Sequence, residues 1–447
     1  MGATETNLAG FVLDYPTEGI PQDIMHLAKR GFMNYCSVAL YASTNPAIDI
    51  LLDVFRVEGG SPVATVLGKG FRTSAQNAAL ANGFLGHYED YDDTHNGSGI
   101  HPASPIVPAA LALGEQVQVS GRDLLAAYAI GVEVACRVGT LIAHNFRDGA
   151  ENWHITNTCG VLGAVAAGGR LLGLTRDQMV YAFAIAGTQA MGVREVFGSM
   201  CKPFHAGKAA QNGTLAAMLA ARGFTATDGI FEGPRGLVGT MARGHDVAQI
   251  TQDLGAHWEL SNAGLKFHAS PAATQGFVDA ILALRTRPGV SPETVKHIQG
   301  TTRQLAPAVV RRRHPRTGLE SKFCYYHVIA VALTDGCAFP AQFVDARVND
   351  PAIESLRNRI DMSEDASFPR GMCVITMELM DGTILTERVP HATGRPENPL
   401  TDAQVQEKFT ALAAAVLPPE RVERARRALW EVDQLSSVTE LVPLMSA

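Results

Sequence analysis

Two segments rich in glycine and alanine constrain the fold of this 447-residue chain more than any other feature. They read TCGVLGAVAAGGRLLGL and GKAAQNGTLAAMLAARGF, with small residues every three or four positions and apolar flanks. Such a composition weakens an isolated helix, but small side chains let two helix backbones approach closely. We therefore expect both segments to be helices at the centre of a large helical domain, and not alanine-rich helices facing solvent.

Helical periodicity continues through most of the first 260 residues. Apolar positions recur at helical spacing in several stretches, including DIMHLAKRGFMNYCSVALYA, SAQNAALANGFLGHYE, VPAALALGEQV, DLLAAYAIGVEVACRVGTL and RDQMVYAFAIAGTQA. Asp123 and Thr175 stand just before two of these runs, so we expect each to be a helix N-cap.

The pattern changes after about residue 265. ETVKHIQGTTRQ alternates β-branched residues, and CVITMELMDGTILTERV predicts a hairpin around Asp381-Gly382, a dipeptide typical of a type I′ turn. Helical pieces lie between them, and DAQVQEKFTALAAAV then resumes the helical pattern. We predict a mainly α protein with an α+β part: a large all-α domain (residues 1–265 and 400–447) and a smaller α/β lid domain (266–399).

Composition favours a folded, intracellular globular protein over several other classes. Hydrophobic residues make up 46% and charged residues 18%, and the net charge of −7 disfavours nucleic-acid binding. The most apolar window, LLAAYAIGVEVACRVGTLIAH, contains Glu133 and Arg137, so we expect a buried helix and no membrane span. The N-terminus lacks a signal-peptide pattern, and seven cysteines without a C-x-x-C pair fit a reduced cytoplasm.

The stretch HYEDYDDTHNGSGIHPAS is the first place where chemistry is expected. It follows an apolar helix and enters a glycine-containing loop, and it holds four carboxylates and three histidines: His87, Glu89, Asp90, Asp92, Asp93, His95 and His101. The spacing fits neither a calcium loop nor a zinc site, so we expect no metal. Crowded carboxylates favour an acid/base site, and the alternative is that these acids cap helices and face water.

Two further segments offer groups that bind anions. In ENWHITNTCGVLGAV, His154 stands just before a small-residue helix, where a helix N-terminus favours anions and a neutral imidazole. The alternative for His154 is a structural role beside Trp153. In MCKPFHAGKAAQNG, the side chains of Lys202, His205 and Lys208 gather ahead of the second small-residue helix, and the alternative is ordinary surface lysines.

The C-terminal half adds polar groups that need partners. SKFCYYHVIA places Tyr326 and His327 in an apolar helix, where their polar atoms require partners or a cleft. The sequence contains no G-x-G-x-x-G opening a strand–helix unit, no phosphate-binding Walker loop and no G-x-S-x-G elbow. These absences disfavour nicotinamide enzymes, nucleotide triphosphatases and α/β-hydrolases.

Taken in order, these segments resemble the MmgE/PrpD family, which includes 2-methylcitrate dehydratases, cis-aconitate decarboxylases and iminodisuccinate epimerases. The resemblance rests on DYDDTHNGSGIHPAS, NWHITNTCGVLGAVAAGGRLLGL, MCKPFHAGKAAQNGTLAAMLAARGF, SKFCYYHVIAVALTDG and GRPENPLTDAQVQEKF, and it spans nearly the whole chain. It implies a large helical domain, a smaller lid domain, a homodimer, a small di- or tricarboxylate substrate, and no metal or organic cofactor.

Carried over motif by motif, the resemblance also implies site residues. Asp90, Thr94, His101, His154 and Lys202 would be catalytic, and His205, Lys208, His268, Tyr326 and His327 would bind substrate. The chain departs from the family where a tyrosine is common, since His327 stands there after Tyr325 and Tyr326, and where a lid histidine is common, since His268 is shifted. Both departures touch the substrate pocket and leave the substrate open.

The family reactions share one intermediate, a carbanion next to a carboxylate. Such a species requires positive charge and aimed hydrogen-bond donors in a site closed to water. We expect His154 or His101 to act as general base or acid, Lys202 to bind the carboxylate, and Asp90 and Thr94 to orient them. Family frequency favours dehydration, closely followed by decarboxylation. Epimerisation through the same carbanion remains an alternative, as does a non-catalytic binder of organic acids.

Overall fold

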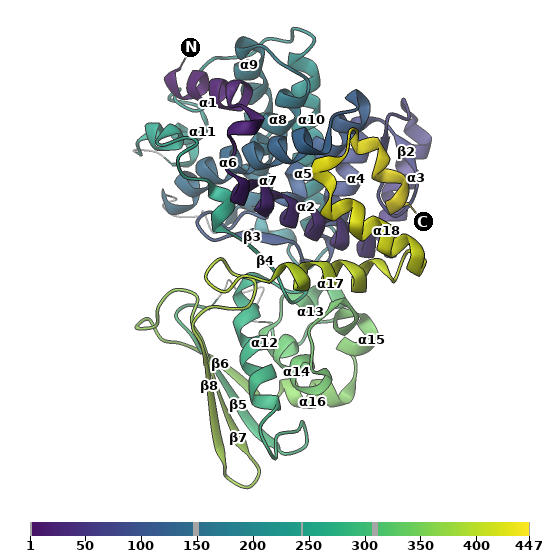
Figure 1. Ribbon diagram of the computed structural model, residues 1–447. Helices are drawn as coiled ribbons and strands as arrows, with labels where there is room; N and C mark the ends of the chain where they lie inside the picture. The colour runs from purple at the N-terminus through teal and green to yellow at the C-terminus, as the bar shows by residue number, and fades with distance from the viewer. Residues whose placement is uncertain (1, 146–151, 243–244, 306–311, 447) are drawn as a thin grey trace.

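A computed structural model describes residues 2–145, 152–242, 245–305 and 312–446. It has a helical part above a smaller α/β part (Figure 1). The helical part contains α1 (Ala3–Asp14), α2 (Gln22–Ala42), α3 (Ala47–Glu58), α4 (Ala75–Tyr88), α5 (Ala103–Val117), α6 (Gly121–Asn145), α7 (Ile155–Thr158), α8 (Gly160–Leu171), α9 (Arg176–Gly187), α10 (Cys201–Ala220), α11 (Leu237–Met241), α17 (Asp402–Ala413) and α18 (Pro419–Trp430).

The two small-residue segments are α8 and α10, and both lie in the centre of this part, as predicted. α10 packs on α4 so closely that a Cβ added at Gly207 would lie 2.4 Å from the Leu80 carbonyl oxygen. A Cβ at Gly213 would lie 2.5 Å from Ala164 in α8. Glycine at these contacts therefore sets the distance between the helices.

One of the two predicted helix caps is present. Thr175 caps α9 in a capping box with Gln178, as expected. Asp123 is not the cap of α6, which begins at Gly121; the Ser120 hydroxyl instead accepts a hydrogen bond from the Asp123 backbone N–H. α6 is long and apolar enough to cross a membrane, but 89% of its most apolar window is buried, which confirms the expected core helix.

The α/β part contains a mixed four-stranded sheet in the order β6-β5-β7-β8, with β5 and β6 parallel and the other pairs antiparallel. Its elements are α12 (Ala272–Arg285), β5 (Val295–Thr302), α13 (Gly318–Lys322), α14 (Tyr325–Asp335), α15 (Asp345–Val348), α16 (Pro351–Arg357), β6 (Ile360–Glu364), β7 (Cys373–Leu379) and β8 (Ile384–Val389). Helices cover one face of this sheet (Figure 1). The sequence interpretation missed α12 and β6.

The predicted hairpin between β7 and β8 is present, but its turn is not type I′. Gly382 has a φ of +86°, whereas Asp381 does not adopt a positive φ, which a type I′ turn would require. The N–H of Gly382 donates to the Leu379 carbonyl, and the N–H of Leu379 donates to Thr383. The loop thus has three residues and ends in a left-handed glycine.

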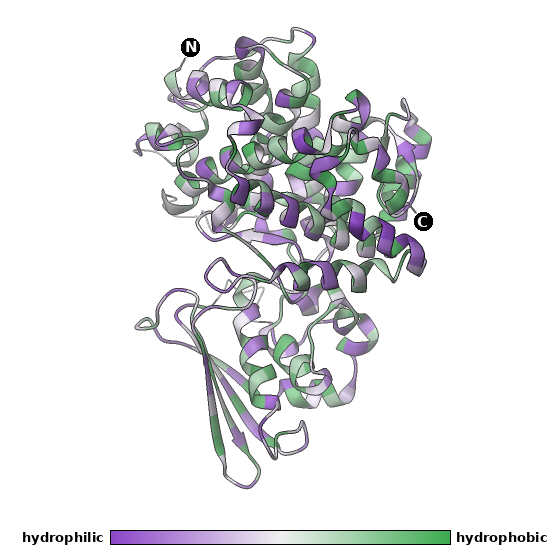
Figure 2. Cartoon of the chain, in the orientation of Figure 1, coloured by the Kyte–Doolittle hydropathy of each residue, from purple (hydrophilic) through white to green (hydrophobic). Residues whose placement is uncertain are grey.

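Two buried apolar clusters underlie the two parts. One runs through the N-terminal helices and α17–α18, and the other joins α12, α14 and the sheet. Hydrophobic colour fills the central helices and alternates along the hairpin strands in Figure 2. The exact boundaries at residues 265 and 400 stay a prediction.

Two short strand pairs lie in the helical part, and one buried lysine contacts both parts. β3 (Asp93–His95) pairs antiparallel with β4 (Ala263–Leu265), and a smaller ladder joins β1 (Ala64–Thr65) to β2 (Arg72–Thr73). α17 lies between the helical part and the α/β part in Figure 1. From it, the fully buried ammonium of Lys408 donates to the carbonyls of Tyr91 and Lys266, at 2.8 Å each.

Candidate active site

The acidic stretch is held inside the protein by β3. The chain leaves α4, turns through Asp90 in a left-handed conformation (φ +51°), pairs along β3 with β4, and then enters α5. A positive φ at a non-glycine residue is strained and persists only where surrounding contacts fix it. Asp90, Asp92 and Asp93 are each at most 2% exposed, so the alternative that these acids face water is wrong.

Buried lysines pair with the acids. Lys266 Nζ lies 2.5 Å from Asp90 Oδ1 and 3.4 Å from Asp92 Oδ1, and Lys202 Nζ lies 3.2 Å from Asp90 Oδ1. Lys322 of α13 reaches across from the α/β part and lies 2.6 Å from Glu89. These side chains are at most 8% exposed, so the pairs are held in a medium that screens charge poorly.

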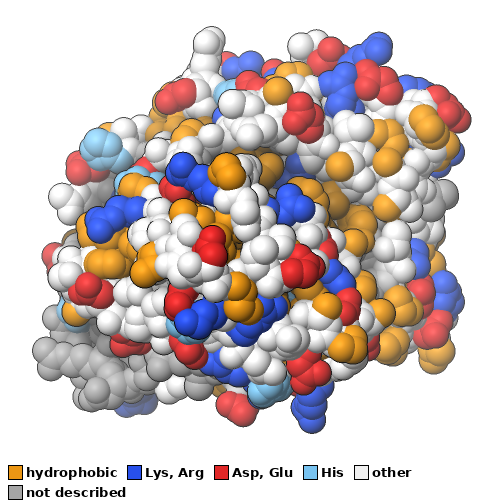
Figure 3. Space-filling view, turned by 90° about the horizontal axis from the view of Figure 1, so that it is seen from below, with side chains coloured by type: hydrophobic (Ala, Val, Ile, Leu, Met, Phe, Trp, Pro, Cys, Tyr) orange, Lys and Arg blue, Asp and Glu red, His pale blue; other side chains and the backbone are white. Residues whose placement is uncertain are grey.

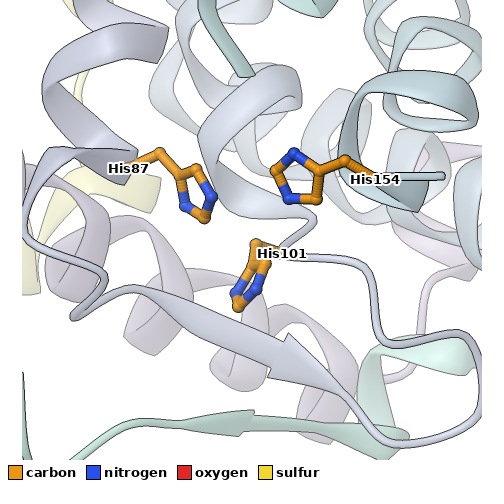
Figure 4. Close-up of side chains that lie close together, drawn as sticks. All are labelled: His87, His101 and His154. Atoms are coloured by element: carbon orange, nitrogen blue, oxygen red, sulfur yellow. The ribbon is translucent and has the colours of Figure 1, made fainter. Parts of the chain in front are cut away.

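Three histidines face one another beside these pairs. Figure 4 shows His87 from the end of α4, His101 from the loop before α5, and His154 from the loop before α7. The ring centroids of His87 and His101 are 4.7 Å apart, and those of His87 and His154 are 5.4 Å apart. We call the set His87, His101, His154, Asp90, Lys202 and Lys266 the histidine cluster.

The hydrogen bonds fix two tautomers. His101 Nδ1 lies 2.6 Å from the Asp93 carbonyl, so this nitrogen carries the proton and Nε2 is left as an acceptor. His87 Nδ1 lies 2.7 Å from the carboxylate of Asp92, and its Nε2 lies 2.8 Å from the Lys202 ammonium. His87 is therefore a neutral ring that donates to Asp92 and accepts from Lys202.

Burial and the lysines keep the histidines neutral. Burial first, and then the Lys202 charge, lowers the pKa of His87 to about 3. Burial likewise lowers the pKa of His101, with Lys266 adding to the effect, and that of His154, with Lys202 adding to it. A buried neutral imidazole is ready to accept a proton once a negative ligand arrives.

The pKa values of Asp90 and Lys202 are lowered as well, by a different balance of causes. Burial alone would raise the pKa of Asp90, but Lys202 and Lys266 outweigh it and hold that pKa well below its usual range. Burial lowers the pKa of Lys202, whereas Asp90 partly restores it. The cluster thus combines ionised Asp90 with two ammonium groups and neutral imidazoles.

Three buried polar atoms in or next to the cluster lack a partner among the described residues. They are Asp90 Oδ2, His154 Nε2 and Asn157 Oδ1. Lys202 Nζ also lies over the rings of Phe197 and Phe323, at 5.4 and 5.2 Å from their centroids. An unpaired buried polar atom costs about 1–3 kcal/mol, and a hydrogen bond from a bound polar molecule would offset that cost.

The residues also offer a possible metal site. One nitrogen each from His87, His101 and His154 lies within 4.8 Å of the others. The sequence interpretation missed this set because His154 comes from a different segment than His87 and His101. The fit is poor, however, because Asp92 and Lys202 already engage the two nitrogens of His87. The ammonium groups next to these histidine nitrogens repel a cation and favour an anion.

The other predicted residues divide into two groups. Thr94 Oγ1 lies 3.3 Å from His101 Nδ1, and His205 Nδ1 lies 3.1 Å from His154 Nδ1, so both join the cluster. Four have contacts elsewhere in the described chain: Lys208 with Gln211, His268 with Asp279, Tyr326 under Arg313, and His327 with Gln342 and Arg357. Their roles in substrate binding stay predictions.

Sequence reasoning missed three central residues. His87 and Asp92 stood in the acidic stretch without an assigned role, and Lys266 was not considered. Lys266 reaches the cluster because β4 pairs with β3, and it lies 176 positions from Asp90 in the sequence. The three-residue strands carry too weak a pattern to predict such a pairing.

The sequence matches the MmgE/PrpD N-terminal domain over residues 6–250 and the MmgE/PrpD C-terminal domain over residues 268–434. The chain belongs to the MmgE/PrpD family. The resemblance stated from the sequence motifs is thereby confirmed. The family match covers the members of the histidine cluster from His87 to Lys202 and the Lys322 that reaches Glu89.

Several curated relatives of this MmgE/PrpD protein are similar over nearly its full length. A cis-aconitate decarboxylase of Aspergillus terreus is 27% identical, covering 96% of this chain and 93% of the relative. The cis-aconitate decarboxylase of Mus musculus is 26% identical, covering 98% and 92%. A 2-methylcitrate dehydratase-like protein of Aspergillus oryzae is 29% identical over 30% of each chain. The chain is thus an enzyme of the lyase class.

Proposed function

We propose that this enzyme is a lyase that needs no cofactor and acts on a small di- or tricarboxylate through a carbanion next to a carboxylate. The observation that carries the proposal is the histidine cluster itself: buried ammonium groups and neutral imidazoles surround buried polar atoms that lack partners. Fixed positive charge in a buried site stabilises developing negative charge far more than it would in water.

We place decarboxylation before dehydration, which reverses the order that family frequency suggested. The relatives matched over their full length are named decarboxylases, whereas the dehydratase-like match covers 30% of the chain. In the proposed reaction, the bond to one carboxyl group breaks and CO₂ leaves. Its electron pair passes into the system conjugated with a remaining carboxylate, and a proton then adds to carbon.

The histidines supply that proton. The negative charges of a bound carboxylate raise the pKa of nearby imidazoles, which burial and the lysines otherwise hold low. His154 is our choice for the general acid, because its Nε2 is buried and has no partner among the described residues. Lys202 would stabilise the enediolate charge, and Asp90 would hold Lys202 in place.

The test is direct assay with two acids. The enzyme is incubated with cis-aconitate or 2-methylcitrate in D₂O, and products are followed by proton NMR together with released CO₂. The proposal predicts CO₂ release with deuterium at one product carbon, and loss of about 10²–10³ in rate for Lys202→Ala. The surface variant Lys296→Ala, 57% exposed beside Glu378, is the matched control and should keep full activity.

Three alternatives have distinct outcomes in the same assay. Dehydration of 2-methylcitrate without CO₂ release would make the enzyme a hydro-lyase. Deuterium exchange into a dicarboxylate with no other change would indicate an epimerase. Binding of an acid without exchange or turnover would indicate a non-catalytic binder.

We also propose that the enzyme is a cytoplasmic homodimer. Light scattering on the purified protein measures its mass and so tests the dimer. Acidic, basic and apolar side chains are interspersed on the face in Figure 3, and we propose no nucleic-acid partner.

A further inference from the structure

A cavity lies where the chain passes twice between the helical part and the α/β part. Its volume is about 180 Å³, and its lining includes Leu265 at the end of β4 and the segment 394–400 that leads into α17. Strand β3 lies between this cavity and the histidine cluster. The Asp93 carbonyl accepts from His101, while Asp93 also lines the cavity.

Glycine brings the two crossing segments into contact at this cavity. Gly394 has a φ of +90°, and a Cβ there would lie 1.9 Å from the Leu265 carbonyl oxygen. A Cβ at Gly264 would lie 2.5 Å from the Gly394 carbonyl oxygen. A molecule in the cavity therefore touches both crossings at once.

Two arginines give the cavity a positive lining. Arg30 donates to the Leu400 carbonyl and pairs with Asp402 at 3.3 Å, but its Nε is buried and has no partner among the described residues. Arg395 donates to Asn96 Oδ1 at 3.0 Å, and within the described chain no carboxylate lies within 4 Å of it. Arg395 thus brings guanidinium N–H donors to the cavity lining, and Arg30 adds positive charge beside it.

One acidic group, Asp93, shares the lining, and it does not cancel the positive charge. Burial, with the neighbouring charge of Asp92, raises the pKa of Asp93 to about 8. This shift favours the uncharged form of the Asp93 carboxyl group. Tyr128 also lines the cavity and brings a hydroxyl beside Asp93.

We propose that this cavity is a second binding site, separate from the histidine cluster, for a small carboxylate that is held by Arg30 and Arg395 and bridges the two crossing segments. A cavity of this volume suits a ligand of a few carbon atoms, because pockets for drug-sized ligands are larger, about 300–1,000 Å³. Guanidinium groups recognise carboxylates through paired N–H donors.

Titration calorimetry with malonate, succinate, citrate and inorganic phosphate tests the proposal. The Lys202→Ala enzyme is used throughout, so that binding at the histidine cluster is weakened. We expect saturable binding of at least one carboxylate, stronger than that of phosphate. Adding Arg395→Gln should weaken it about ten- to hundredfold, the loss of one charged hydrogen-bonding group. The affinity of Arg395→Lys, which keeps the charge but not the planar guanidinium, should lie between the affinities with arginine and with glutamine at this position.

Arg388→Gln is the matched control, because Arg388 lies over the Phe368 ring and outside the cavity lining. Circular dichroism spectra check that each variant is folded. Equal affinities for the Arg395→Gln and Arg388→Gln enzymes would overturn the proposal. So would the absence of saturable binding by all four anions. Failure of the decarboxylase assay would leave this result unaffected, because binding is measured without turnover.

Discussion

Replacing Lys266 with methionine should destabilise the protein strongly, because it removes a buried cation and leaves its partners behind. The ammonium of Lys266 donates to Asp90 Oδ1 at 2.5 Å and to the Asp90 carbonyl at 2.9 Å, and lies 3.4 Å from Asp92. Removing one member of a buried pair costs about 3–5 kcal/mol. Asp90 keeps Lys202 at 3.2 Å, so we expect the lower end, about 3 kcal/mol.

Urea unfolding followed by circular dichroism measures this loss, and Lys296→Met is the matched control. The Lys296–Glu378 pair is 2.6 Å long but 57% and 37% exposed, so its loss should cost about 0–1 kcal/mol. The pKa of Asp90 should also rise in Lys266→Met, since one of the two charges that hold it low is gone. Equal losses for the two variants would refute the assignment of Lys266 as a buried partner of the acids.

The remaining predictions concern pH, packing and proton transfer. The pKa of His87 is about 3 in the folded protein and 6.5 in an ordinary imidazole, so between these values only the unfolded chain binds the extra proton. As pH drops from 6.5, His87 alone should lower the free energy of unfolding by about 1.4 kcal/mol per pH unit, and His101 and His154 should add to the slope. His87→Asn should therefore make the slope shallower. Gly207→Ala should destabilise the protein by about 1–3 kcal/mol, because the new Cβ would lie 2.4 Å from the Leu80 carbonyl oxygen. Gly10→Ala in α1 is the control, since its Cβ would have its nearest neighbour at 3.8 Å, and it should be neutral or stabilising. Thermal unfolding of both variants measures the difference. His154→Gln should lower kcat by about 10²–10⁴ while substrate affinity changes little; an unchanged kcat would exclude His154 as the general acid.

Sequence predicted those features that depend on neighbouring residues. The capping box at Thr175 needs only Gln178, three positions away, and it formed as expected. The small residues of α8 and α10 indicated close helix packing, and Gly207 and Gly213 provide it. Motif order likewise indicated which segments carry the cluster, and Asp90, His154 and Lys202 do lie together.

Features that depend on distant pairing were missed. Lys266 enters the cluster only because three residues of β4 pair with β3, and no local pattern marks those strands. The Asp381-Gly382 dipeptide suggested a two-residue turn, but the registers of β7 and β8 require three residues in the loop. The roles of His87 and Asp92 likewise follow from contacts with Lys202 and Lys266, which sequence spacing does not encode.

The most direct test of whether lysines and histidines alone stabilise the carbanion is to measure turnover after a chelator has removed metal ions from the enzyme. The stripped enzyme, assayed beside its Lys202→Ala variant with the same acid, should keep full activity, while Lys202→Ala loses about 10²–10³ in kcat. Loss of activity on chelation, restored by adding a divalent ion, would contradict this account and assign His87, His101 and His154 to a metal.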